Sequence, residues 1–269
     1  MIPRKISINF SDVPLHWTRI PEFATMQNAG SPIASQSEIF VNGMMAKAKK
    51  YIAPEKTGLL EEMRIFVEQE SNHCNLHASF NRELYARGYH AVREYEARMR
   101  IFYKNMLKDR SVQFCAAYCA GFENIALFSS KFAFEHAPDL FEGGDQRMVD
   151  LYKWHLAEEF EHRTVAHAVF KEVSGNYFMR LYGTFVAFRS LNKFQKDIYE
   201  IITKIDYQSI SKEEIEQSKK REKRLKKRMA FYIIPRMLKI VLPYYNPENH
   251  SIPQSVQESL DYYEKMAAA

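Results

Sequence analysis

Apolar side chains recur at helical spacing along several long segments of the chain. Between residues 57 and 87 they return every three or four positions and form one continuous stripe. Similar stripes run through 111–135 and 146–173, and Ser35 or Ser37 can cap a further helix over 36–52. Segments of this length and period predict amphipathic helices that pack against one another.

Further helices are predicted outside these four. Residues 90–107 form a charged connector, residues 177–205 are rich in Tyr, Phe and Leu, and a short helix is expected near 254–266. Only nine glycines occur in 269 residues, which argues against a fold rich in strands and turns. The predicted fold is therefore all-α, with a four-helix core and extra flanking helices.

Prolines at positions 3, 14, 21 and 32 lie too close together for a long helix near the N-terminus. We therefore expect residues 1–35 to form an extended arm that wraps across the helices. Residues 36–206 would form the helical bundle. Residues 207–269 would add a basic and apolar helical extension to the same domain.

Polar residues interrupt the apolar stripe of the 146–173 helix. His155, Glu159 and His162 follow one another at i, i+4 and i+7, so they share one face of the helix. A buried carboxylate or imidazolium without a partner costs several kcal/mol, so such groups are usually paired or bound to metal. A surface helix with charged neighbours is the alternative.

A second helix repeats this chemistry. Glu70 and His73 have the Glu-x-x-His spacing of Glu159 and His162, and His77 lies one turn further on. Two such helices, each with a Glu-x-x-His pair, and one glutamate from each of two others make the ferritin-like di-metal pattern. The sequence therefore predicts a ferritin-like four-helix bundle and requires two further glutamates.

Two glutamates meet this requirement. Glu123 is the only charged side chain between Ser111 and Ser130, so it is protonated, hydrogen-bonded or bound to a cation. Glu38 lies in the first turn of its predicted helix, where the helix dipole also favours a carboxylate. Mixed carboxylate and imidazole donors suit iron or manganese better than structural zinc. The candidate metal ligands are Glu38, Glu70, His73, His77, Glu123, His155, Glu159 and His162.

Motifs along nearly the whole chain resemble one protein family. They are Asn9-Phe10, Pro14-x-His16-Trp17, Gln69-Glu70-x-x-His73-x-x-x-His77-x-x-x-Asn81, Trp154-His155-x-x-Glu158-Glu159-x-Glu161-His162 and Tyr244-Tyr245-x-Pro247-x-x-His250. The chain is similar to the bacterial proteins called predicted metal-dependent hydrolases. Its helices also resemble those of ferritin-like di-iron proteins. The triplet of His155, Glu159 and His162 resembles the di-iron arylamine N-oxygenases, in which an additional histidine joins the ligands.

These residues support three functions. The leading hypothesis is an oxidase or oxygenase that uses two iron or manganese ions and O2 to oxidise a small organic substrate. The second is hydrolysis by a metal-activated water, with Glu158 or Glu161 as the catalytic group that moves the proton. The third is a non-catalytic metal-binding bundle. The sequence does not separate the first two, because both need the same ligands.

The net charge of +5 is concentrated in one segment. Eight of the ten residues from Lys219 to Arg228 are lysine or arginine, and the apolar segment 229–234 follows directly. The segment 219–234 is either a solvated helical face or a contact surface for an anionic membrane or an acidic partner. No nucleic-acid-binding motif accompanies the charge, so we expect no nucleic acid partner.

Cysteine usage and the N-terminal sequence bear on location. Three cysteines, Cys74, Cys115 and Cys119, are too few for a disulfide framework and indicate a reducing compartment. The first residues lack the apolar core of a signal peptide. We therefore expect a cytoplasmic protein, with association to a membrane and formation of a homodimer both left open.

Overall fold

The computed structural model describes residues 1–268, and all regular structure in that range is helical. The long helices are α1 (Pro21–Ala48), α2 (Thr57–Ala86), α3 (His90–Asp109), α4 (Val112–Lys131), α5 (Gln146–His162), α6 (Val165–Val173), α7 (Tyr177–Asp206), α8 (Lys212–Ile240) and α9 (Gln254–Ala268). Short helical turns follow α1, α4 and α8: η1 (Lys49–Tyr51), the π-turn η2 (Phe132–His136), η3 (Pro138–Phe141) and η4 (Pro247–Asn249). The all-α prediction is confirmed.

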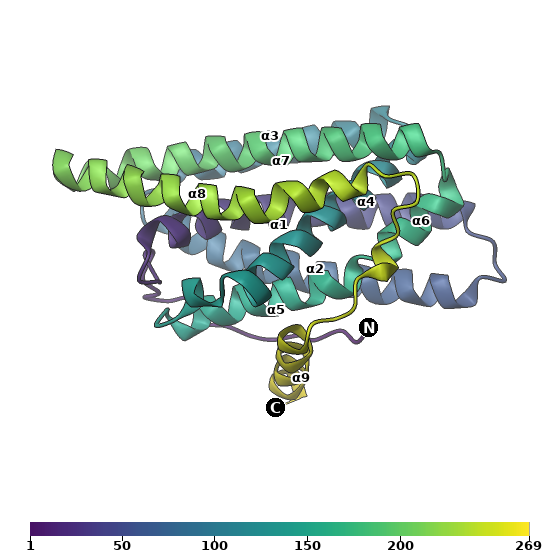
Figure 1. Ribbon diagram of the computed structural model, residues 1–269, viewed down its shortest axis with the longest axis horizontal. Coiled ribbons are helices and arrows are strands. Elements are labelled where there is room, and N and C mark those ends of the chain that lie inside the picture. Colours follow the sequence, from purple (N-terminus) through teal and green to yellow (C-terminus); the bar gives the residue numbers. More distant parts are fainter. Residues whose placement is uncertain (269) are drawn as a thin grey trace.

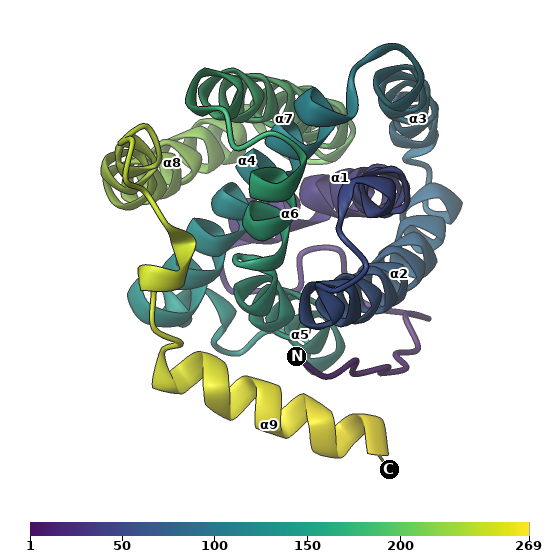
Figure 2. The same cartoon turned by 90° about the vertical axis from the view of Figure 1, so that its right-hand side faces the viewer.

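Four helices pack around a common interior (Figures 1 and 2). Helix α1 contacts α2 and α4, and α4 contacts both α5 and its continuation α6. Large apolar side chains fill the interior between them, among them Phe40, Phe66 and Phe160, which are fully buried. The segments predicted as the core, 36–52, 57–87, 111–135 and 146–173, thus do pack together. The ferritin-like assignment stays a prediction.

The first core helix begins earlier than expected. Helix α1 starts at Pro21 rather than near Ser35, so the extended arm covers only residues 1–20 and not 1–35. Pro21 lies in the first turn, where a missing N–H costs no helical hydrogen bond. Pro32 does lie inside the helix, and its ring is buried there. Tertiary packing therefore outweighs the loss of one helical bond at Pro32.

The last core helix is broken where a single helix was expected. Helix α5 ends at His162, two residues form a turn, and α6 resumes at Val165. The guanidinium of Arg163 donates to the backbone oxygen of Phe160 at 2.5 Å. In a continuous helix that oxygen would accept from the amide of Thr164. The Arg163 side chain thus occupies the Phe160 oxygen, whose backbone hydrogen bond would otherwise continue the helix beyond His162.

The N-terminal arm lies against the core helices, as predicted for its first part. Trp17 stacks on Tyr152 of α5 with ring centroids 5.4 Å apart, and Phe10 contacts Phe80 of α2. The indole of Trp154 donates to the backbone oxygen of Arg4 at 3.0 Å. The arm therefore ties α5 and α2 together on the side of the bundle where the chain begins (Figure 1).

The remaining helices cover the outside of this core. Helix α7 presses closely on α4, since a Cβ added to Gly183 would lie 2.5 Å from the carbonyl carbon of Ala117. Helix α8 packs over α4 and η2, and α9 lies across α5 (Figure 2). The predictions of helices at 177–205 and 254–266 are confirmed. Within residues 1–268, no helix combines the length and apolarity needed to cross a membrane. The cytoplasmic location stays a prediction.

Candidate metal centre

Side chains from all four core helices meet inside the bundle. Glu38 comes from α1, Glu70 and His73 from α2, Glu123 from α4, and His155, Glu159 and His162 from α5. Glutamate and histidine three residues apart share a helix face, so each Glu-x-x-His pair points inward as a unit. All but His155 are 0–1% exposed. His155 keeps 12% of its side chain exposed.

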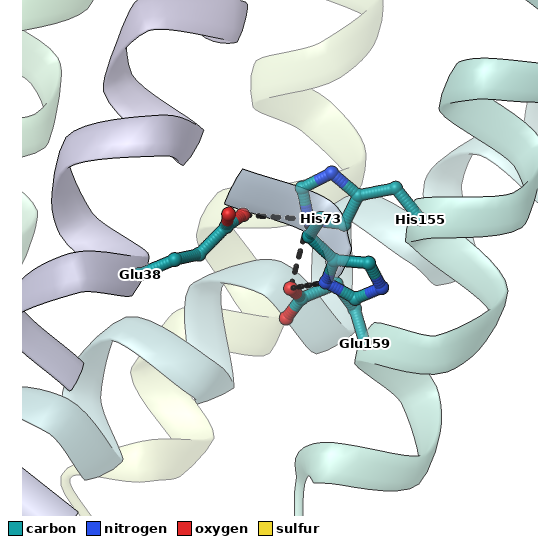
Figure 3. Close-up of side chains that lie close together, drawn as sticks. All are labelled: Glu38, His73, His155 and Glu159. Carbon is teal, nitrogen blue, oxygen red and sulfur yellow. Dashed lines mark hydrogen bonds and ion pairs between the residues drawn. The ribbon is translucent and has the colours of Figure 1, made fainter. Parts of the chain in front are cut away.

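The first group of converging side chains contains Glu38, His73, His155 and Glu159 (Figure 3). Each offers one ligand atom, and these atoms lie within 4.8 Å of one another. The Nε2 atom of His155 is 2.8 Å from Glu159 Oε1 and 3.4 Å from Glu38 Oε1. Such a cluster can surround one cation.

The second group contains Glu70, His73, Glu159 and His162. The Nδ1 atom of His162 lies 2.8 Å from Glu70 Oε1 and 3.8 Å from Glu159 Oε2. Glu123 adjoins this group, with its Oε2 atom 4.0 Å from the same nitrogen. The two groups share His73 and Glu159, so together they form one continuous cluster of metal-donor side chains.

Most donor atoms of this cluster have no hydrogen-bond partner outside it. Both carboxylate oxygens of Glu38, Glu70 and Glu123, one oxygen of Glu159 and the Nδ1 atoms of His73 and His162 are buried and form no hydrogen bond outside the cluster. Buried polar atoms are almost always satisfied, so each exception requires an explanation. One explanation covers all nine atoms, since each is a metal-donor atom turned toward the same space. The residues present therefore fit bound metal.

The electrostatics of the cluster lead to the same conclusion. Burial raises the pKa of Glu38 and of Glu123 well above the ordinary value, and neighbouring carboxylates raise both pKa values further. Burial also lowers the pKa of His73 well below its ordinary value. For His162, burial opposes protonation, but the charges of Glu70 and other carboxylates prevail and raise its pKa to about 9. Bound cations would relieve this repulsion among the carboxylates.

The histidines of the two Glu-x-x-His pairs are held by a reciprocal pair of hydrogen bonds. His73 Nε2 bonds to Glu158 Oε2 at 2.9 Å, and His162 Nε2 bonds to Gln69 Oε1 at 3.0 Å. Glu158 and Gln69 each directly precede the glutamate of a Glu-x-x-His pair, and each holds the histidine of the opposite helix. These bonds fix both rings with Nδ1 directed at the cluster, as outer partners do in metal sites.

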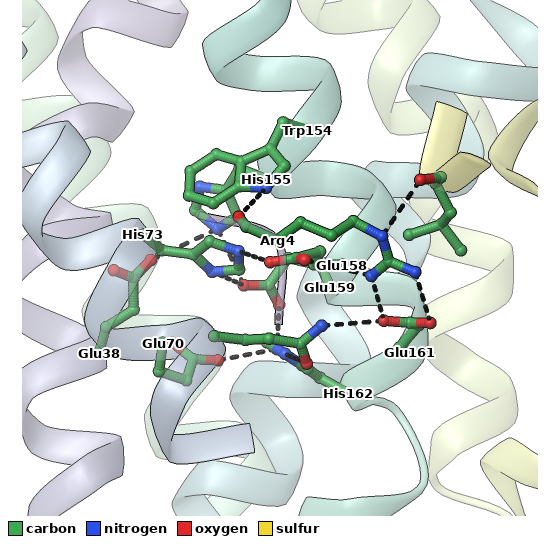
Figure 4. Close-up of polar contacts among 12 residues, drawn as sticks. Arg4, Glu38, Glu70, His73, Trp154, His155, Glu158, Glu159, Glu161 and His162 are labelled. Atoms are coloured by element: carbon green, nitrogen blue, oxygen red, sulfur yellow. Dashed lines mark hydrogen bonds and ion pairs between the residues drawn. The ribbon is translucent and has the colours of Figure 1, made fainter. Parts of the chain in front are cut away.

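Arg4 joins the residues behind the cluster into a network (Figure 4). Its Nη1 atom donates to Glu158 Oε1 at 3.2 Å and to Glu161 Oε2 at 3.0 Å. Glu161 also accepts from Gln69 Nε2 at 2.9 Å. Sequence reasoning assigned no role to Gln69, which it noted only as part of a motif, and it missed Arg4. Gln69 repeats the position of Glu158 and could have been found, whereas no spacing marks a residue of the extended arm.

Glu158 and Glu161, the predicted catalytic residues, are both engaged in this network. Burial raises the pKa of Glu158 to about 7, against the opposing charges of His162 and Arg4. The carboxylate of Glu158 contacts His73 rather than the space between the ligands. Glu161 contacts only the outer residues of the network. Their catalytic role stays a prediction.

His77 is the one predicted ligand that lies outside the cluster. Its Nε2 atom is 2.6 Å from His155 Nδ1, and its Nδ1 atom is 2.8 Å from Ser31 Oγ. Ser31 in turn donates to Asn81 Oδ1 at 2.7 Å. With both ring nitrogens engaged, His77 supports His155 from behind. His77 lies one helical turn beyond His73 on α2, and its ring nitrogens therefore do not join the donor atoms of the cluster.

A comparison with protein families gives one match. The model of a family described as "Predicted metal-dependent hydrolase" matches residues 2–251. The matched range includes Arg4, every side chain of the cluster and all of α8, and it stops before α9. No curated protein and no solved structure matches the chain.

Proposed function

The chain belongs to the family of predicted metal-dependent hydrolases. From the donor set of its buried centre, we propose that this centre holds two iron or manganese ions and oxidises a small organic substrate with O2. The observation that carries the proposal is the set of nine buried donor atoms without partners outside the cluster. Two shared residues, His73 and Glu159, make the two cation positions adjacent. Adjacent positions are what a bridged metal pair requires.

The ligand types favour a redox centre. Two Glu-x-x-His pairs and two single glutamates from four helices match the di-iron and di-manganese carboxylate pattern. Carboxylate and imidazole donors suit iron and manganese, and the cluster contains no thiolate. Two ferrous ions would supply electrons for the reduction of O2. The ferritin-like arrangement and the similarity to arylamine oxygenases belong to this proposal.

The chain's own residues bind, orient and shield this centre. Glu158 and Gln69 hold the ligand histidines in a single orientation. The ring of Phe66 lies 4.5 Å from that of His162, and the ring of Trp154 lies 4.7 Å from that of His73. These aromatic walls exclude water, which strengthens electrostatic interactions in the site and protects reactive species from side reactions.

Hydrolysis is the second candidate, because the family description names it. A metal-bound water loses a proton more easily than bulk water and can attack an ester, amide or phosphate. Glu158 has a pKa of about 7, which suits a group that exchanges protons near neutral pH. Its ion pair with Arg4 would have to loosen for that role.

Metal analysis followed by oxygen consumption separates these functions. The protein is prepared without affinity-tag metals, loaded with ferrous iron or manganese under anaerobic conditions, and analysed for metal per chain. We expect up to two ions per chain and O2 uptake on addition of a reductant. Glu159→Ala should lose at least one ion and the uptake, whereas the exposed Glu62→Gln should keep both.

The other outcomes are equally informative. Bound metal without O2 uptake, combined with cleavage of ester or phosphate substrates, would favour hydrolysis. Bound metal with neither activity would leave a non-catalytic metal-binding bundle. Protein that takes up no iron and no manganese would refute all three functions.

A further inference from the structure

Helices α7 and α8 lie side by side on the outside of the bundle and run in opposite directions (Figure 1). At one end, Tyr177 Oη donates to the backbone oxygen of Val241 at 2.6 Å. At the other end, the hydroxyls of Tyr207 and Ser218 are 3.2 Å apart. The first half of α7 therefore lies beside the second half of α8.

The outer stripe of α8 changes character along its length. Lys220, Arg224, Lys227, Phe231, Ile234 and Leu238 follow one another at alternating spacings of four and three residues, so they share one face. The first three are basic and exposed. The last three are apolar, yet Phe231 is 71% and Leu238 is 62% exposed. The opposite face, with Leu225 and Tyr232, is buried against the bundle.

The outer stripe of α7 changes in the opposite order. Phe178, Tyr182 and Phe185 are exposed in its first half, with Phe178 at 76% and Phe185 at 59%. The same spacing continues into the exposed residues Arg189 and Lys196. Because the helices are antiparallel, the apolar half of α7 lies beside that of α8. We call the apolar part, with Phe178, Phe185, Phe231 and Leu238, the apolar patch, and Lys220, Arg224 and Lys227 of α8 the basic patch.

A solvated helical face explains only the basic patch. None of Lys220, Arg224 and Lys227 has a carboxylate within 4.0 Å among the residues that the structure describes, so these charges are free to meet an external anion. Four or more large apolar side chains exposed together are unusual for a surface in contact with water and indicate an interaction site. Any partner of this surface must satisfy both patches.

We propose that the α7–α8 surface binds the anionic face of a lipid membrane without crossing it. Lysine and arginine are attracted to anionic headgroups, and neighbouring aromatic and aliphatic side chains enter the boundary between headgroups and acyl chains. A second copy of this chain docked through the apolar patch would leave the basic patch without a partner. An anionic membrane would contact both the apolar patch and the basic patch. The surface is also larger than the predicted segment 219–234, since α7 contributes exposed apolar side chains to it.

Vesicle co-sedimentation of the full-length protein tests the proposal. The probes are vesicles of phosphatidylcholine alone and vesicles that also contain phosphatidylserine, each at low and high salt. We expect binding only with phosphatidylserine and release by salt, because salt screens the attraction. Replacing Lys220, Arg224 and Lys227 together by glutamine should weaken binding about a hundredfold, at about fivefold for each charge.

Two further variants separate charge from apolar contact. Phe231→Gln with Leu238→Gln leaves the charge intact and should also weaken binding. Replacing three exposed basic residues of α3, Arg98, Lys104 and Lys108, by glutamine removes the same net charge elsewhere and should leave binding nearly unchanged. All these positions are exposed, so metal content and thermal stability should match wild type, whatever the function of the metal centre.

Three results would overturn the proposal. One is wild-type protein that ignores phosphatidylserine, and another is an α3 variant that loses as much binding as the α8 variant. The third is wild-type protein that binds no vesicles and forms a homodimer by light scattering, when the double variant Phe231→Gln with Leu238→Gln is a monomer. That result would assign the apolar patch to a second copy of the chain.

Discussion

Glu123→Gln should have two opposite effects on stability. It should relieve repulsion among the carboxylates of the metal-free cluster, and it should weaken metal binding. Burial raises the pKa of Glu123 well above the ordinary 4.5, and the charges of Glu159 and Glu70 raise it further. A carboxyl group with a raised folded-state pKa binds its proton more tightly in the folded state. The metal-free protein should therefore lose stability as pH rises from about 4.5 through the raised pKa. Glutamine has nearly the same shape and does not ionise, so it should remove part of that loss.

The size of the metal effect follows from the two proposed cation positions. Free metal at about a hundred times its dissociation constant stabilises the folded state by about 2.7 kcal/mol for each independent site. Two ions would contribute about 5.4 kcal/mol by the same relation. At about 2–4 °C for each kcal/mol, the unfolding midpoint should rise by about 10–20 °C. A Glu123→Gln variant that retains one ion should show about half of that rise.

Thermal unfolding of metal-free and metal-loaded protein, at mildly acidic and mildly alkaline pH, measures both effects. Metal-free Glu123→Gln should unfold at a higher temperature than metal-free wild type at alkaline pH. It should gain less from iron or manganese. The exposed Glu62→Gln on α2 should behave as wild type in every condition. A wild-type midpoint that neither metal moves, or a metal-free Glu123→Gln midpoint below that of wild type at alkaline pH, would refute the reasoning.

Three further substitutions test single features of the structure. His155→Ala should lose the ion nearest Glu38, as measured by metal analysis; full occupancy would leave the imidazole only an orienting role. Arg4→Ala should weaken metal affinity about 10–100-fold in a chelator competition, because Glu158 would no longer be held against His73, whereas the exposed neighbour Lys5→Ala should not. Equal metal affinities for these two variants would show that Arg4 does not support metal binding. Gly183→Ala forces a Cβ against α4 and should lower stability to urea by about 1–3 kcal/mol, so an unchanged urea midpoint would contradict the close packing of α7.

Residues whose role depends on spacing along one helix could be predicted from the sequence. The pairs Glu70 with His73 and Glu159 with His162 lie on single helices, so their common direction follows from 3.6 residues per turn. Glu123 was predicted because it is the only charge in an apolar helix. The structure places all of these within one cluster.

Features that depend on contacts between distant segments could not be predicted. The helical conformation at Pro32 relies on packing that no local propensity describes. The break after His162 depends on a hydrogen bond from Arg163. Arg4 reaches Glu158 across 154 positions of sequence, from an arm without periodicity. His77 has the spacing of a ligand, but only the position of His155 shows that it lies behind another imidazole.

The reciprocal bonds from Gln69 to His162 and from Glu158 to His73 couple the centre to the alignment of two helices. If α2 slid along α5 by one turn, about 5.4 Å, both bonds would break together and both Glu-x-x-His pairs would leave the cluster. A single inserted or deleted residue within 69–73 or 158–162 would turn the ligands about 100° around the helix axis. These two short segments should therefore tolerate no change in length.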